Sequence, residues 1–266
     1  MDAAQAIVKV GQRLLNTEFG RKTLTEEFIV SWKRKLTRFC PASDLALLAY
    51  MHETDKFGYH SYIKHYQKHF APLRSKPVSI LEIGVGGYEG ATTGGSSLRM
   101  WKQYFKKGNV FGIDINDKSG VDESRIKTFR GDQSDPAFLR QVAKSIGTID
   151  IIVDDGSHIN NHVIAAFECL FPLLADDGIY VVEDVQTSYW PNFGGSSTEL
   201  SANTTIMGYF KNLTDGLNYQ DMVPDKKPTY FDLHITEMCF YHNLIFVHKG
   251  LNDDPPGHFG RPASDS

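Results

Sequence analysis

The sequence Ile149-Asp-Ile-Ile-Val-Asp-Asp-Gly-Ser-His158 joins an apolar run to two carboxylates and an imidazole. Apolar runs of this length are typical of strands that are buried on both faces of a parallel sheet. A second run, Gly178-Ile-Tyr-Val-Val-Glu183-Asp184, also ends in two acids. Because ligands bind outside the carboxyl ends of parallel strands, we expect both acidic pairs and His158 to meet at one rim of the sheet.

The rest of the sequence contains further strand-like runs. Short β-branched runs alternate with amphipathic stretches from residue 78 onward, which predicts parallel β-α units. The expected strands are 78–83, 110–115, 126–129, 149–154 and 179–183, and the expected helices are 97–105, 136–145 and 162–174. Two further runs, 233–241 and 244–249, flank His242-Asn243 and indicate an antiparallel hairpin at the sheet edge. The predicted fold is α/β, a doubly wound, mostly parallel, seven-stranded sheet of the Rossmann-like type.

The chain divides by its pattern into three parts. Residues 1–72 carry apolar residues at helical spacing and predict an N-terminal helical section. Residues 73–252 form the expected catalytic domain. Within it, the Ser-, Gly- and aromatic-rich segment 186–227 is too long for an ordinary connection, and we expect it to be a lid that covers a substrate. Residues 253–266 predict a disordered tail.

Composition restricts the possible partners and the compartment. With 28 basic and 32 acidic residues, the formal net charge of -4 gives no overall attraction for nucleic acid or for an anionic membrane surface. No apolar run approaches the roughly 20 residues that span a bilayer, and the N-terminus lacks the apolar stretch of a signal peptide. The three cysteines are far apart, which argues against a disulfide framework. We expect a cytoplasmic protein with no nucleic-acid or membrane partner.

The first expected strand runs into a glycine-rich loop, Leu81-Glu82-Ile83-Gly84-Val85-Gly86-Gly87-Tyr88. Gly84 and Gly86 would let the backbone pass close to a ligand. A dinucleotide fingerprint requires a third glycine three residues after the second, where this chain has Glu89. Glu82 would repel a pyrophosphate but attract a cationic amino or sulfonium group, so the loop favours S-adenosylmethionine over a nicotinamide dinucleotide.

Single acids mark the ends of the next two expected strands, since Asp114 lies near the end of 110–115 and Asp132 follows 126–129. Asp114 could accept hydrogen bonds from both hydroxyls of a ribose, and Asp132 lies where an adenine amino group would be bound. Either acid alone could equally be a helix cap or a solvated loop residue. With Glu82, these make three acids at the ends of three consecutive strands, and a cofactor site is the better interpretation.

Together these residues resemble the metal-dependent class I S-adenosylmethionine methyltransferases that methylate sugar hydroxyls of macrolides and related antibiotics. The resemblance covers residues 55–195 and rests on the order Glu82-x-Gly84-x-Gly86, Asp114, Asp132, Asp154-Asp155-Gly-Ser-His158 and Glu183-Asp184. It implies that Asp155, Glu183 and Asp184 bind the metal and that His158 is the catalytic base. It also implies a cofactor site, whose predicted members are Thr54, Lys56, Tyr62, Glu82, Gly84, Gly86, Asp114, Ile115, Asp132, Gln133 and Asp154.

Elementary chemistry supports these roles. A sugar hydroxyl is a poor nucleophile near neutral pH, and a divalent cation can lower the pKa of a hydroxyl while orienting it. Carboxylate oxygens suit Mg²⁺ best, and His158, three residues after Asp155, could take the hydroxyl proton. A structural histidine and helix-capping acids are the ordinary alternatives, but capping needs only one acid where this chain has two.

Three aromatic residues follow the second acidic pair. Tyr189, Trp190 and Phe193 could pack in the core, but in a Ser- and Gly-rich segment they better suit the apolar wall of an acceptor site. The predicted function is Mg-dependent O-methylation of a sugar hydroxyl on a glycosylated natural product, by a homo-oligomer. The alternatives are a nicotinamide-dependent oxidoreductase, a hydroxylase-associated protein similar to cephalosporin hydroxylases, and a non-catalytic cofactor-binding protein.

Overall fold

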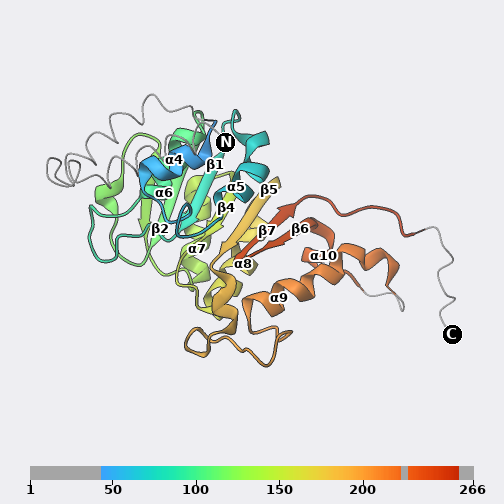
Figure 1. Cartoon of the computed structure of the whole chain (residues 1–266). Helices are drawn as coiled ribbons and strands as arrows, with labels where there is room; N and C mark the ends of the chain where they lie inside the picture. Colours follow the sequence, from blue (N-terminus) through green and yellow to red (C-terminus); the bar gives the residue numbers. More distant parts are fainter. Residues whose placement is uncertain (1–42, 223–226, 258–266) are drawn as a thin grey trace, which may run out of the picture.

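The structure, a computed structural model, describes residues 43–222 and 227–257. Its seven-stranded sheet is formed by β1 (Ser79–Ile83), β2 (Asn109–Asp114), β3 (Ile126–Arg130), β4 (Ile149–Asp154), β5 (Leu174–Glu183), β6 (Ile235–Tyr241) and β7 (Leu244–Lys249). The strand order is β3-β2-β1-β4-β5-β7-β6 (Figure 1). Neighbours among β1 to β5 are parallel, whereas β7 pairs antiparallel with β5 and β6. The predicted mostly parallel sheet with a C-terminal antiparallel hairpin is confirmed.

Helices cover both faces of the sheet. The first face carries α4 (Leu45–His52), α5 (Ile63–Phe70) and α6 (Ser96–Tyr104), and the second carries α7 (Pro136–Ile146), α8 (Asn160–Leu170) and α9 (Ile206–Leu213). Tyr66 and Trp101 lie fully buried in the first core, and Phe167 and Phe210 in the second.

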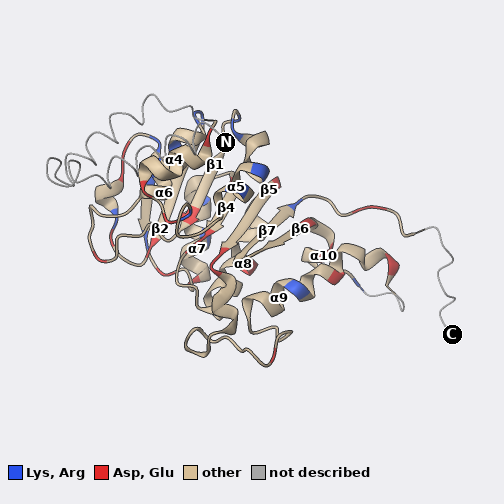
Figure 2. Cartoon of the chain, in the orientation of Figure 1, with Lys and Arg blue, Asp and Glu red and all other residues tan. Residues whose placement is uncertain are grey.

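Alternation of side chains along each strand divides the apolar residues between the two cores. In β4, Val153 packs in the first core, while its neighbour Ile152 packs in the second. In β5, Val181 and Val182 divide in the same way. An acid ends each of β2, β4 and β5, at one rim of the sheet (Figure 2). The same alternation therefore determines the face toward which each of these acids points.

Element boundaries differ from the expected ones where a local signal outweighs hydrophobic pattern. The expected helix 162–174 ends earlier, at Leu170, because Pro172 cannot continue an α-helix. Leu233, expected in a strand, lies in α10 (Tyr230–His234), whose first turn has a capping box between Thr229 and Asp232. β5 starts before the expected residue 179, since the exposed Asp176 and Asp177 in its first half hide its extended backbone from a hydrophobic pattern.

The segment 186–227 has secondary structure of its own where it is described. It contains η5 (Val185–Tyr189), η6 (Pro191–Phe193), α9 and η7 (Thr214–Asp221), and Ile206 of α9 is fully buried in the second core. Its function as a lid stays a prediction. The expected helices before residue 43, and most of the expected tail, lie outside the described residues. None of the described helices is long and apolar enough to cross a membrane.

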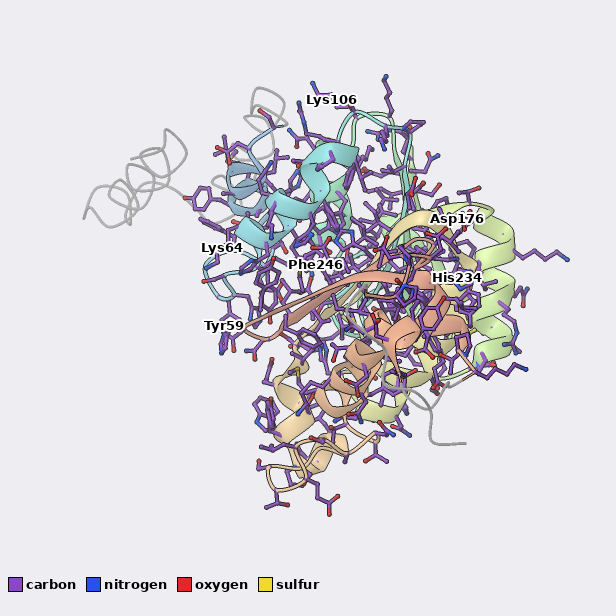
Figure 3. The ribbon with its side chains drawn as sticks, turned by 90° about the vertical axis from the view of Figure 1, so that its right-hand side faces the viewer. Tyr59, Lys64, Lys106, Asp176, His234 and Phe246 are labelled. Atoms are coloured by element: carbon purple, nitrogen blue, oxygen red, sulfur yellow. The ribbon has the colours of Figure 1, made fainter. Side chains whose placement is uncertain are left out.

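His69 on α5 fastens this helix to the antiparallel hairpin. Its ring stacks on Phe246, which lies within the packed interior (Figure 3), with the centroids 4.2 Å apart. Its Nδ1 lies 2.9 Å from Nε2 of His248, and its Nε2 lies 3.0 Å from the Tyr241 hydroxyl. Burial, with a smaller contribution from His248, lowers the pKa of His69 to about 4. His69 therefore stays neutral in the native state at pH values where the unfolded chain protonates it, near the ordinary histidine pKa of about 6.5.

We expect His69→Gln to weaken the acid sensitivity of folding. Because the native pKa of His69 is lowered, the wild-type chain binds fewer protons than its unfolded form between about pH 6.5 and about pH 4, and its stability falls across that window. A glutamine at this position cannot titrate, so the stability difference between the two proteins should shrink by roughly 2–3 kcal/mol from pH 7 to pH 4. Urea unfolding at both pH values measures this, and parallel losses in the two proteins would contradict the assignment.

Candidate functional site

A pocket of about 720 Å³ opens at the carboxyl ends of β1, β2 and β4. The strand order changes direction here, because β1 has β2 on one side and β4 on the other. Open α/β sheets bind their ligands at such a switch point, and this volume lies within the range of about 300–1,000 Å³ that is usual for small-molecule sites. The pocket wall contains Asp114 and Asp132 together with Asp155, His158 and Asp184. The rim predicted from the sequence therefore exists as one continuous cavity.

The glycine loop after β1 touches the loop after β4. Gly84 has φ +94°, and a Cβ there would lie 2.0 Å from the carbonyl oxygen of Asp155. Only glycine fits this crossing. Farther along the loop, the exposed Tyr88 has φ 48°, and the buried Lys118 donates from Nζ to the carbonyl oxygens of Tyr88, at 2.5 Å, and Gly90, at 3.0 Å. Lys118 thus anchors the loop, a function that no periodic or motif signal in the sequence indicated.

Asp114 and Asp132 are held in place by backbone N–H groups. Asp114 accepts from Val85 through Oδ2, at 3.1 Å, and from Asn116 through Oδ1, at 2.9 Å. The backbone N–H of Ser134 lowers the pKa of Asp132, which favours a charged carboxylate at the pocket wall. Both acids are therefore oriented without any ligand.

The predicted cofactor residues separate into a pocket wall and a layer behind it. The wall contains Thr54, Gly84, Gly86, Asp114, Ile115, Asp132 and Gln133. Four others do not line the pocket: Lys56, Tyr62, Glu82 and Asp154. Direct contact of these four with a cofactor stays a prediction.

Strand alternation explains why Asp154 and Glu82 turn away. Asp154 points to the second face, where it accepts from Gln133 Nε2 at 3.2 Å and from the Tyr180 hydroxyl at 3.3 Å. Burial raises the pKa of Asp154 to about 7. Glu82 points to the first face, where its Oε2 accepts from Trp101 Nε1 at 2.7 Å.

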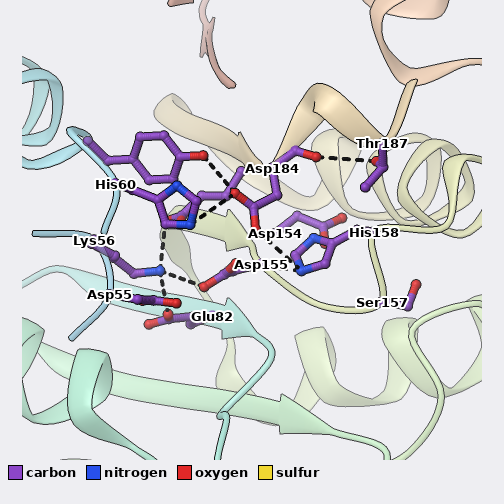
Figure 4. A network of polar contacts seen from close by, with 12 residues as sticks. Asp55, Lys56, His60, Glu82, Asp154, Asp155, Ser157, His158, Asp184 and Thr187 are labelled. Carbon is purple, nitrogen blue, oxygen red and sulfur yellow. Dashed lines mark hydrogen bonds and ion pairs between the residues drawn. The ribbon is translucent and has the colours of Figure 1, made fainter. Parts of the chain in front are cut away.

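An inner cluster, which we define as Lys56, Glu82, Glu183 and Tyr66, lies beneath the pocket on the first face. The Lys56 ammonium lies 2.8 Å from Glu183 Oε1, 3.3 Å from Glu82 Oε1 and 2.6 Å from Asp155 Oδ2 (Figure 4). Burial opposes the charge of Lys56, but Asp155, Glu183 and Glu82 together raise its pKa well above the usual value. Burial and the nearby Asp155 raise the pKa of Glu183, which also accepts from the Tyr66 hydroxyl.

An outer cluster, Asp155, His158 and Asp184, faces the pocket. Each of the three offers one ligand atom, and these atoms lie within 4.8 Å of one another. His158 Nε2 lies 4.0 Å from Asp155 Oδ1 and 3.8 Å from Asp184 Oδ2. Asp155 thus connects the two clusters, since its Oδ2 contacts Lys56 of the inner cluster and its Oδ1 faces His158 of the outer cluster.

Two tyrosines one helical turn apart hold the second acidic pair, and sequence reasoning did not assign this joint function. Tyr62, just before α5, donates to Asp184 Oδ1 at 2.6 Å, while Tyr66 donates to Glu183. Their i, i+4 spacing was the available signal, because such residues lie on one face of a helix. His60 Nε2 also lies 3.6 Å from Asp184 Oδ1.

Backbone strain concentrates around the pocket. Six described residues other than glycine have positive φ, and four of them line the pocket: Glu53, Tyr88, His158 and Asp184. A left-handed conformation costs a residue with a Cβ about 1–2 kcal/mol and persists where surrounding structure enforces it, which is characteristic of functional sites. For His158 and Asp184 this conformation directs both side chains to the outer cluster.

The predicted acceptor residues follow Asp184 directly. Tyr189 and Trp190 are partly exposed at 38% and 46%, and the rings of Trp190 and Phe193 lie 5.8 Å apart. The buried Asn160 donates to the carbonyl oxygens of Thr187 and Phe193, at 3.0 and 2.9 Å. Asn160 therefore fixes the backbone that carries these aromatic residues, and none of the three lines the pocket wall.

Comparison with known proteins finds close relatives, although no protein-family model matches the chain. Mycinamicin VI 2''-O-methyltransferase of Micromonospora griseorubida is 42% identical over 256 residues, which are 95% of this chain and 62% of the relative. The 8-demethyl-8-alpha-L-rhamnosyl tetracenomycin-C 2'-O-methyltransferase of Streptomyces olivaceus is 49% identical over 221 residues, or 81% of this chain and 56% of the relative.

A solved structure agrees with these relatives. The MycE methyltransferase of the mycinamycin pathway, in complex with Mg, SAH and mycinamycin VI, is 41% identical and superposes with a TM-score of 0.79. The match covers 99% of this chain and 65% of that one. The chain therefore spans less than two thirds of the length of these relatives.

Proposed function

We propose that this chain, which belongs to the family of class I sugar O-methyltransferases of macrolide and polyketide pathways, transfers a methyl group from S-adenosylmethionine to a sugar hydroxyl of a glycosylated natural product. One observation carries the proposal. A single pocket contains two oriented acids suited to a nucleoside, Asp114 and Asp132, and a carboxylate-imidazole cluster suited to a cation and a proton transfer. Methyl transfer to a hydroxyl requires the cofactor-binding part and the cation-binding part of the pocket to lie close together.

The cofactor half follows from the wall residues. We assign Asp114 to the ribose hydroxyls and Asp132 to the adenine edge, because both carboxylates are preset by backbone N–H groups and both line the pocket. The close passage of Gly84 over the loop after β4 would bring the donor methyl near Asp155 and His158. Glu82 supports the floor beneath this point rather than lining the pocket.

The outer cluster fits Mg²⁺. Its carboxylates are hard oxygen ligands, and Lys56 compensates only part of the negative charge of Glu82, Asp155, Glu183 and Asp184. We propose Asp155 and Asp184 as ligands, with Glu183 as the third through Oε2, since Oε1 is engaged by Lys56 and Tyr66. When bound, the cation would lower the pKa of the acceptor hydroxyl and orient it.

His158 would act as the base from the opposite side of the acceptor oxygen. Its Nε2 lies 4.0 Å from Asp155 Oδ1 and 3.8 Å from Asp184 Oδ2, at the pocket wall where the acceptor hydroxyl would lie. Trp190 and Phe193, whose backbone Asn160 fixes a few residues after Asp184, would offer an apolar surface for the sugar or aglycone. A homo-oligomer and a cytoplasmic location remain part of the proposal.

The proposal predicts methylation that depends on a divalent cation. With S-adenosylmethionine labelled in its methyl group and a panel of deoxysugar glycosides, we expect products heavier by one methylene from at least one glycoside and none from the matching aglycones. Full chelation should lower the rate at least 100-fold, and Mg²⁺ should restore it. Activity that survives chelation would refute the metal assignment. A product heavier by one oxygen, or calorimetric binding of a nicotinamide cofactor in place of S-adenosylmethionine, would favour the alternative enzymes.

A further inference from the structure

The side chain of Lys56 is fully buried, with carboxylates from three strands or strand ends around its ammonium. Glu82 comes from β1, Asp155 follows β4, and Glu183 ends β5. Lys56 itself comes from the segment between α4 and α5. One cation therefore joins the N-terminal part of the described chain to the centre of the sheet.

This arrangement resembles a cation site more than an ordinary ion pair. An ammonium that is removed from water is costly unless it is surrounded by opposite charge. Lys56 has three carboxylate oxygens, at 2.6, 2.8 and 3.3 Å, while Tyr66 and Trp101 bond to the same acids from behind. Glu82 Oε1 has no hydrogen-bond partner among the described residues, so its compensation comes from the Lys56 charge.

The two oxygens of Asp155 show how the cation acts on the site. Oδ2 lies 2.6 Å from Lys56, which leaves Oδ1 directed toward His158 and the pocket. Without the ammonium, Asp155 Oδ2 and Glu183 Oε1 would be available to a second cation in the space beneath the pocket. The Lys56 ammonium occupies this space.

We propose that Lys56 is a positioning residue whose ammonium occupies the space between Glu82, Asp155 and Glu183, and that it thereby confines the divalent cation to the pocket side, at Asp155, Asp184 and Glu183 Oε2. This inference rests on the proposed function for the existence of the outer cation. It adds that the position and the number of bound cations are set by a lysine that is itself no ligand.

Substituting Lys56 tests this without any methyl-transfer assay. In Lys56→Met, three buried carboxylates lose their cation, and the melting temperature in EDTA should fall by roughly 5–15 °C. Mn²⁺ alone, without cofactor, should restore at least half of this loss and bind with a stoichiometry one ion higher than in the wild type, as counted by electron paramagnetic resonance. A merely structural ion pair would leave the response to Mn²⁺ unchanged.

Lys56→Arg provides a second test if the methionine variant does not fold. Its charge is retained, so the melting temperature in EDTA should stay near that of the wild type, but the larger guanidinium should extend toward the pocket side and weaken Mn²⁺ binding at least 10-fold. Lys102→Met is the matched control, because Lys102 forms a partly exposed ion pair with Glu123 far along α6. It should behave as the wild type in every measurement.

The outcomes distinguish this inference from the proposed function. If the wild type binds Mn²⁺ and both Lys56 variants bind it with the same affinity and number of ions, confinement by Lys56 is wrong while the metal assignment stands. If the wild type binds no Mn²⁺ at all, the outer cation fails and the inference fails with it.

Discussion

Asp155→Asn is expected to abolish cation-dependent methyl transfer, with kcat/KM at least 1,000-fold lower and Mn²⁺ affinity at least 100-fold lower. This corresponds to a loss of about 4 kcal/mol of transition-state stabilisation. The variant keeps the shape of the side chain, so cavity formation cannot explain the loss. The substitution removes the negative charge and replaces one of the two carboxylate oxygens, which contact Lys56 and face His158, by an amide nitrogen.

The two contacts of Asp155 make asparagine particularly damaging. Lys56 will attract the amide oxygen, because that contact is the shortest of the ammonium, at 2.6 Å. The amide nitrogen must then face His158 and Asp184, where it offers hydrogens instead of a lone pair to a cation. A hydrogen-bond donor at the ligand position of Asp155 would repel the cation that the carboxylates of Asp184 and Glu183 attract.

Asp177→Asn serves as the control for the loss of one negative charge. Asp177 is exposed in the first half of β5, at the opposite end from Glu183. Kinetics and Mn²⁺ binding should both match the wild type. If Asp155→Asn retained more than a tenth of the wild-type kcat/KM with normal Mn²⁺ affinity, Asp155 would not be a metal ligand, and the outer cluster would need another function.

The sheet and the edge at which the site lies could be predicted because they depend on short-range patterns. Apolar runs of strand length, separated by helical stretches, suffice to place five parallel strands, and their carboxyl ends must share one rim. Asp114 is the last residue of β2, and Asp155 and His158 lie in the loop after β4, so their arrival in one pocket follows from topology alone. The resemblance to a known family supplied what topology could not, namely the chemistry.

The division into an inner and an outer cluster was not predicted, although the information was partly present. Glu82 and Glu183 each stand two residues after a strand residue that packs in the first core, on the side of α5 and α6. Asp154 stands two residues after Ile152, which packs in the second core. Counting residues along each strand would have turned the first two toward one face and Asp154 toward the other. That Lys56 meets them depends on a contact across 99 residues of sequence to Asp155, which no local pattern contains.

His158→Asn is expected to lower kcat by about 100- to 10,000-fold, the usual contribution of a positioned general base, while Mn²⁺ and S-adenosylmethionine affinities stay within about 3-fold of the wild type. Asparagine is the informative substitution, because His158 has φ 55° and asparagine tolerates this left-handed conformation better than alanine. The variant thus removes the imidazole without adding backbone strain.

The same variant decides between two functions of this imidazole. His158 lies near enough to Asp155 and Asp184 to be a further ligand beside the three carboxylates, and its buried Nδ1 has no hydrogen-bond partner among the described residues. If it is a ligand, Mn²⁺ affinity should fall about 10- to 100-fold together with kcat, and the base must be sought elsewhere. If kcat alone falls, the imidazole accepts the proton and the cation is held by carboxylates. His234→Ala should change neither quantity, because His234 ends α10, does not line the pocket and lies at the opposite end of the β6–β7 hairpin from the second acidic pair.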